Sequence, residues 1–245
     1  MMGKQHVALA VTATSTASIL LSTVPPHTSA WMVPWTDALQ YAVLLPIVAL
    51  FSLVPDADLG TSTISRAHPV TTSIFRMFFH EHRGASHWLL TALVFGAAGV
   101  GLSMLPGAVT ILGYTIPWSR LLMVVLFSSS LAMLAGMVGV VRTSAGHIVS
   151  ILVFLACLPL CQYSFWPVRT MGAAMALGMA LHGVGDMLTE QGLAWLKPFS
   201  PVVLRCNING PAGGQREKHV TAPLLTFLAV ATTAAAFWLM VSPRS

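Results

Sequence analysis

Long apolar runs separated by short polar loops dominate the pattern of this chain. We predict one helix in each of seven segments: 6–24, 38–54, 88–105, 119–141, 146–163, 170–190 and 221–241. A run of about 20 apolar residues is long enough for a helix to cross a bilayer, whereas barrel strands are shorter and alternate. The pattern therefore predicts an all-α fold, a polytopic transmembrane bundle of about seven helices forming a single domain over residues 1–245.

The first of these segments is the weakest, because it is rich in Thr and Ser. A signal peptide is the alternative, since Lys4 precedes the segment and the tripeptide TSA follows at 28–30. We favour a retained helix, because the segment lacks a Leu-rich centre and Pro25-Pro26 would end a helix.

Composition supports a membrane protein and gives its orientation. The chain is 56% hydrophobic and 8% charged, against roughly 25% charged residues in a soluble domain. Its net charge of +5 comes from Lys and Arg scattered through loops, so no nucleic-acid partner is expected. A cytoplasmic N-terminus places nine of the twelve basic residues inside, as the positive-inside rule requires. These nine are Lys4, Arg66, Arg76, Arg83, Arg142, Lys197, Arg205, Arg216 and Lys218.

Acidic residues are scarce, and four of the seven lie in or beside histidine-containing clusters. Ionisable groups near a bilayer are costly and often functional. In the predicted topology four distant segments bring His and Asp to the cytoplasmic face. The residues are His6, Asp56 and Asp58 in PDAD, His80, Glu81, His82 and His87 in HEHRGASH, and His182 and Asp186 in HGVGD.

The sixth predicted helix carries His182 and Asp186 four residues apart, so both side chains share one face. That spacing offers one ion a nitrogen and an oxygen ligand, although a hydrogen-bonded pair is the alternative. The small residues Gly178, Gly183 and Gly185 suggest that a neighbouring helix packs closely there.

The PDAD stretch closes the second helix with two acids. Asp56 and Asp58 would oppose the helix macrodipole there, and a cation would compensate. A solvated helix end is the alternative interpretation.

In HEHRGASH, Gly84 permits a turn and the third helix is expected to begin near Ala85. Arg83 can hold a phosphate or carboxylate with two hydrogen bonds. The stretch is not an HExxH zinc motif, because Gly occupies position 84. We interpret His80 as a solvated loop residue.

This mixed His/Asp set favours zinc, with manganese or iron as alternatives. A bound ion lowers the pKa of water, and a spare carboxylate can accept the proton. We assign Asp58 to that role and Arg83 to an anionic substrate group. The pattern indicates metal-assisted hydrolysis of a phosphoester or of another ester or amide bond.

Four stretches carry a family resemblance: GKQH at 3–6, LVPDADL at 53–59, HRGASHWLL at 82–90 and GMALHGVGDMLTEQGLAWLKPF at 178–199. They resemble the YdjM-like family of bacterial inner-membrane proteins, which are described as metal-dependent hydrolases. The resemblance implies a multi-pass protein of the bacterial inner membrane. More weakly, Glu217 matches an acidic position of the family after the last cytoplasmic loop. It implies as metal ligands His6, Asp56, Asp58, His82, His87, His182 and Asp186.

The chain departs from the family pattern at four positions. Gln5 and Ser86 stand where Thr is usual, and Trp88 and Leu181 stand where Ser is usual. None of these changes removes an expected ligand, but Trp88 removes a hydroxyl group. The ligand pattern is also similar to that of zinc-dependent phospholipase C enzymes, which use helical HxxxD pairs.

Three functions compete. The favoured one is a hydrolase whose metal site lies at the cytoplasmic membrane face, beside lipids, and acts on a lipid or lipid-linked phosphoester. A metal-ion or proton transporter would place such groups near the bilayer midplane, whereas this cluster lies near one end. The third is a structural protein whose polar groups satisfy one another.

Overall fold

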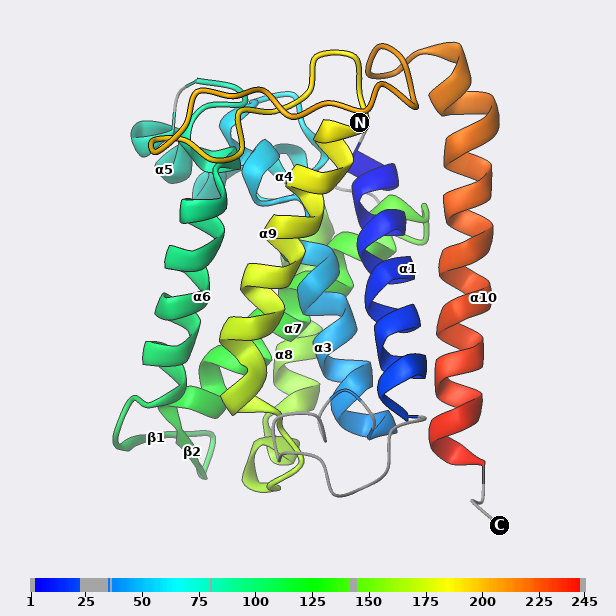
Figure 1. Cartoon of the computed structure of the whole chain (residues 1–245). Helices are drawn as coiled ribbons and strands as arrows, with labels where there is room; N and C mark the ends of the chain where they lie inside the picture. Colours follow the sequence, from blue (N-terminus) through cyan, green and yellow to red (C-terminus); the bar gives the residue numbers. More distant parts are fainter. Residues whose placement is uncertain (1–2, 23–34, 36, 80, 142–144, 243–245) are drawn as a thin grey trace.

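The computed structural model describes residues 3–22, 35, 37–79, 81–141 and 145–242. In this part of the chain, long helices lie side by side as a bundle (Figure 1). Each of the seven predicted segments overlaps one of them, so the all-α class is confirmed. The helices are α1 (Gly3–Ser22), α3 (Ala38–Phe51), α6 (Leu89–Ser103), α7 (Trp118–Met137), α8 (Gly146–Cys157), α9 (Met171–Met187) and α10 (Ala222–Val241).

Helix length alone supports fewer membrane crossings than the seven predicted. Within the described residues, two helical stretches are long and apolar enough to span a membrane, Trp118–Met137 and Glu217–Val241. Helices α3, α6 and α8 are apolar but shorter, with 14, 15 and 12 residues. At 1.5 Å per residue they reach about 18–23 Å, against a hydrocarbon core of about 30 Å. The seven-span arrangement therefore stays a prediction.

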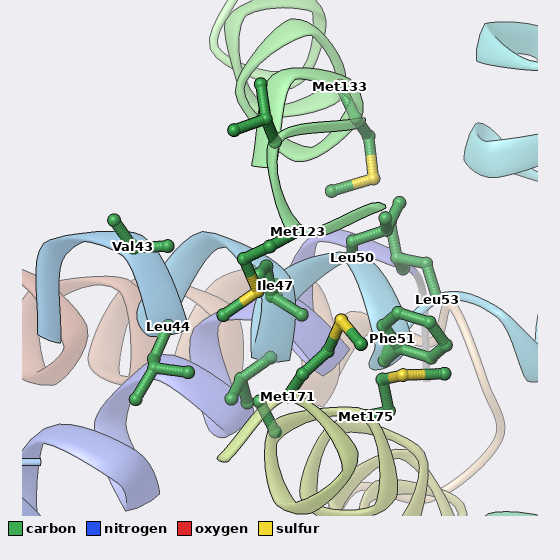
Figure 2. Close-up of a cluster of buried hydrophobic side chains, with 14 of the residues drawn as sticks. Val43, Leu44, Ile47, Leu50, Phe51, Leu53, Met123, Met133, Met171 and Met175 are labelled. Carbon is green, nitrogen blue, oxygen red and sulfur yellow. The ribbon is translucent and has the colours of Figure 1, made fainter. Parts of the chain in front are cut away.

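Helix α3 forms the centre of the bundle. Its side chains Ile47 and Phe51 are buried between α7 and α9. Figure 2 shows Met123 of α7 and Met171 and Met175 of α9 turned toward them. Methionine is flexible and fills irregular gaps between helices. This packing fixes the position of α9 relative to the end of α3, which matters for the site.

Helices α6 and α9 approach each other through glycines. A Cβ added at Gly172 would clash with the Gly96 carbonyl oxygen, and one at Gly99 would lie 2.6 Å from the Gly172 Cα. The prediction of close packing also holds at Gly178, where a Cβ would meet the Val48 carbonyl oxygen of α3. Small residues let backbones come this close.

The predicted 55–87 loop contains structure that the sequence did not reveal. Helix α3 ends at Phe51, so the two acids of PDAD lie in a separate 3₁₀ helix rather than at its last turn. Helix α6 begins at Leu89, after an extended Trp88, and not near Ala85. The short elements are η1 (Pro55–Asp58), α4 (Thr63–Ala67), α5 (Pro69–Phe78) and η2 (Ala85–His87).

A β-hairpin between α6 and α7 was also not predicted. Strands β1 (Ala108–Ile111) and β2 (Tyr114–Pro117) pair antiparallel at the opposite end of the bundle from α5 (Figure 1). Leu112 and Gly113 both have positive φ, 51° and 84°, as a two-residue hairpin turn requires. The remaining short helices are η4 (Pro159–Gln162), η5 (Val168–Thr170) and the π-helix η6 (Glu217–Thr221).

Candidate metal centre

Four segments that are distant in sequence meet at one end of the bundle. They are the first turn of α1, the 3₁₀ helix η1, the 81–87 stretch that ends in η2, and the last turns of α9. All seven predicted ligands lie there, in three overlapping groups whose candidate ligand atoms are within 4.8 Å of one another. The groups are His6, His182 and Asp186; Asp56, His87 and His182; and Asp58, His82 and His87.

Three imidazole nitrogens face two carboxylates in the middle of this cluster. His87 Nε2 lies 3.7 Å from Asp56 Oδ1 and 3.6 Å from Asp186 Oδ2. His182 Nε2 lies at the same two distances from the same two oxygens. His6 Nε2 lies 3.5 Å from Asp186 Oδ1, and its ring stacks on His182 with centroids 3.8 Å apart. The predicted common face of His182 and Asp186 is therefore confirmed.

These nitrogens are buried, and within the described residues they have no hydrogen-bond partner. This holds for Nε2 of His6, His87 and His182. Leaving a buried polar atom unsatisfied costs about 1–3 kcal/mol. The 3.5–3.7 Å separations are too long for good hydrogen bonds. They are close to the ligand-to-ligand spacing of about 3.3 Å around an ion with bonds of about 2.0–2.1 Å.

The His182 ring is oriented by the backbone. Its Nδ1 lies 2.8 Å from the Ser52 carbonyl oxygen, just after α3, and so donates the proton that this contact requires. The Nε2 lone pair then points into the cluster, as metal-ligating histidines need. The packing of α3 against α9 provides this contact, which sequence spacing could not show.

The charge of the cluster also fits a divalent cation. Asp58 and Asp186 are buried and Asp56 is largely buried, and among the described side chains the Arg83 guanidinium pairs with Asp186. Among these side chains the three carboxylates outnumber the one guanidinium, which leaves an excess of negative side-chain charge. Buried charges need compensation, and a divalent ion would offset this excess.

Asp58 lies one layer behind the central nitrogens. Its Oδ1 is 3.1 Å from His82 Nδ1, and its Oδ2 accepts a 2.7 Å hydrogen bond from Ser86 Oγ. The same Oδ2 lies 3.4 Å from His87 Nδ1. The Asp58 side chain is fully buried, whereas His82 is 45% exposed. Asp58 therefore supports His82 and His87 from inside.

Arg83 contacts the protein rather than an open surface. Its Nη2 donates to Asp186 Oδ1 at 3.1 Å, and its Nη1 donates to the Gly192 carbonyl at 3.1 Å. Arg83 has a φ of 59°, and a Cβ at the next residue, Gly84, would lie 2.7 Å from the Glu81 carbonyl oxygen. This tight turn carries Arg83 to Asp186. Its role with a substrate stays a prediction.

The pKa values of Asp56 and His87, which lie outside the membrane-embedded helices, favour the protonation states that bind a metal. Burial alone would raise the pKa of Asp56, yet the imidazoles of His182 and His87 hold it below its ordinary value. Burial lowers the pKa of His87, against the opposing effect of Asp56. His82 differs, because its hydrogen bond to Asp58 raises its pKa and favours the protonated ring. Near neutral pH, Asp56 is thus ionised and His87 neutral, as metal binding requires.

The family comparison agrees with this geometry. The model of the YdjM inner membrane protein family matches residues 1–135. The chain belongs to this family. No curated protein and no solved structure matches the chain.

The YdjM match includes His6, Asp56 and His87 but ends before α9. His182 and Asp186 are therefore assigned to the site by their position in the structure. Their side-chain atoms lie 3.5–3.7 Å from those of residues in the matched part. The family supports an inner-membrane location, and the His/Asp groups could hold a metal ion. Neither observation identifies the ion or the reaction.

Other candidates lie apart from the centre. Glu217 is buried in η6, and its Oε2 accepts a hydrogen bond from the Gly213 N–H at 2.9 Å, outside the three ligand groups. His68 and His147 contact each other edge to face, with ring centroids 5.5 Å apart. His80 lies outside the described residues.

Proposed function

We propose that this YdjM family member is a membrane-bound metal-dependent hydrolase. The observation that carries the proposal is the set of buried Nε2 atoms of His6, His87 and His182, which face Asp56 and Asp186 and have no hydrogen-bond partner in the part of the chain that the structure describes. Nitrogen and carboxylate ligands together favour zinc, with manganese or iron as alternatives. The proposed substrate is a phosphoester or a lipid-linked compound.

The reaction would take place on the exposed side of the centre. A bound divalent ion would lower the pKa of water there and supply a nucleophile near neutral pH. His82 is half exposed beside Asp56 and is positioned to accept the proton of that water. Asp58 is fully buried, so it would act through His82 by orienting the ring and stabilising its charged form. This modifies the sequence-based role of Asp58 as the direct base.

We further propose a single multi-pass domain with seven membrane helices, a cytoplasmic N-terminus and the site at the cytoplasmic face. The nine basic residues counted above support this orientation. Helix α5 supports placing the site at a membrane surface, because it lies at the same end as the site (Figure 1) and exposes an apolar stripe. Its spacing of i, i+4, i+7 and i+8 suits a helix in the lipid headgroup zone. The stripe is Val70, Ile74, Met77 and Phe78.

The first test is metal content, measured by elemental analysis of detergent-purified protein prepared without chelators. We expect near-stoichiometric zinc or manganese in the wild type and its loss in His87→Ala and Asp186→Ala. His219→Ala is the matched control, because His219 is exposed and outside the three ligand groups. A metal-free wild-type protein would overturn the proposal.

Activity is the second test. Metal-loaded wild type should cleave at least one phosphodiester, phospholipid or other ester substrate, and Asp186→Ala should not. Metal flux into liposomes that His182→Ala abolishes, without hydrolysis, would instead establish a transporter. Loss of stability in His87→Ala with unchanged metal content would indicate a structural role.

A further inference from the structure

A cavity of about 550 Å³ opens beside the candidate metal centre. Asp56 and His82 form part of its wall, and both belong to the ligand groups. The side chains of Asp56 and His82 are 14% and 45% exposed. The side chains of the other candidate ligands are at most 3% exposed. The cavity is therefore where a substrate can reach the centre.

Two cations line the same cavity. Lys4 comes from the first turn of α1 and Arg66 from α4. Within the described residues neither side chain has an ion pair or a hydrogen bond. An unpaired ammonium and an unpaired guanidinium around one cavity make a site that favours an anion.

The wall between these cations supplies neutral hydrogen-bond groups. The Gln5 side chain lines the cavity and is only 5% exposed. Its amide N–H groups can donate to an anion, whereas its Oε1 atom can only accept. Gly3, Lys4 and Gln5 form the first turn of α1, whose backbone N–H groups lack partners within the helix and attract anions. The hydroxyl groups lining the cavity are those of Thr61, Ser62 and Thr63.

Charge favours an anion here once the metal is bound. Arg83 and one divalent ion would offset the carboxylates of Asp56, Asp58 and Asp186. Lys4 and Arg66 then add two positive charges to the wall of the cavity. A phosphomonoester carries nearly two negative charges at neutral pH. Its oxygens can accept hydrogen bonds from both cations while the phosphorus faces the centre.

We propose that this cavity binds the phosphate group of the substrate, with Lys4, Arg66 and Gln5 as its recognition residues. The inference rests on the proposed hydrolase function and narrows its substrate class to phosphate esters. Arg83 is paired with Asp186. We therefore assign phosphate binding to Lys4 and Arg66 rather than to Arg83. The phosphate group could belong to a lipid headgroup or to a soluble ester.

The test is calorimetric titration of detergent-purified full-length protein, both metal-free and zinc-loaded. One probe is inorganic phosphate, and the other is short-chain phosphatidic acid in the same detergent. The variant is Lys4→Gln/Arg66→Gln. The matched control is Lys197→Gln/Arg205→Gln, which removes two exposed cations of the α9–α10 connection that do not line the cavity.

We expect the Lys4→Gln/Arg66→Gln variant to keep its zinc and its thermal stability but to bind phosphate about 100-fold more weakly, tenfold for each charged hydrogen bond lost. The control should bind like the wild type. Binding of phosphatidic acid alone would identify a lipid source, and binding of both probes would show that the phosphate group suffices. Wild-type protein that binds neither probe, or a double variant that binds as well as wild type, would overturn the inference.

The two proposals can fail separately. If the wild type holds no metal but its phosphate binding still depends on Lys4 and Arg66, the metal-centre proposal fails and the phosphate site stands. If zinc is stoichiometric and phosphate binding is insensitive to both cations, the opposite holds.

Discussion

Removing the metal ion should lower the thermal stability of the purified protein. Without an ion, the buried Nε2 atoms of His6, His87 and His182 find no hydrogen-bond partner among the described residues, at a cost of about 1–3 kcal/mol each. Zinc at a free concentration 100 times its Kd would stabilise the folded protein by about 2.7 kcal/mol. For a chain of this size, that corresponds to an increase in Tm of about 5–10 °C.

The chain's seven tryptophans allow intrinsic fluorescence to follow unfolding in detergent. Wild-type protein should show the shift between zinc and EDTA, and His219→Ala should show it too. His182→Ala should lose the shift, because it removes one of the central nitrogens. An equal zinc-dependent shift in wild type and His182→Ala would refute the reasoning, since the stabilising ion would then be bound elsewhere.

Three further outcomes are expected. Asp58→Asn should keep its zinc but slow hydrolysis by about 10²–10⁴-fold, because His82 loses its charged partner; a full rate would rule out this role. Zinc occupancy, measured by elemental analysis over a pH series, should persist below the ordinary histidine pKa of about 6.5, because burial lowers the pKa of His87; loss of zinc at pH 7 would contradict this. Gly172→Val should lower Tm through its clash with Gly96, a cost of about 1–3 kcal/mol, without changing hydrolysis in the folded fraction; an unchanged Tm would mean that the two helices separate easily.

Sequence spacing alone determined what lies within a single element. The seven apolar runs predicted the long helices correctly, because the length and apolar composition of a run can be seen directly in the sequence. His182 and Asp186 share a face because a helix repeats every 3.6 residues. The convergence of four segments followed from counting basic residues in loops, since membrane topology assigns each loop to a side.

Short elements in the loops escaped the sequence because they carry weak local signals. The PDAD acids lie in η1, and α5 begins at Pro69, inside a stretch interpreted as a loop. The hairpin of β1 and β2 depends on positive φ at Leu112 and Gly113, and leucine gives no hint of that conformation. Such elements form because the bundle provides surfaces against which they pack.

The division of roles among the polar residues was decided by tertiary structure. The turn at Gly84 brings Arg83 to Asp186, a contact that the sequence did not show, while its predicted role with a substrate stays a prediction. Lys4 and Arg66, which looked like topology signals alone, line a cavity beside the centre. The sequence determined which residue types reach one membrane face, because spacing and loop charge act locally. Only the crossing of α1, α3 and α9 decided which nitrogen faces which carboxylate, because distances between elements depend on how their side chains pack.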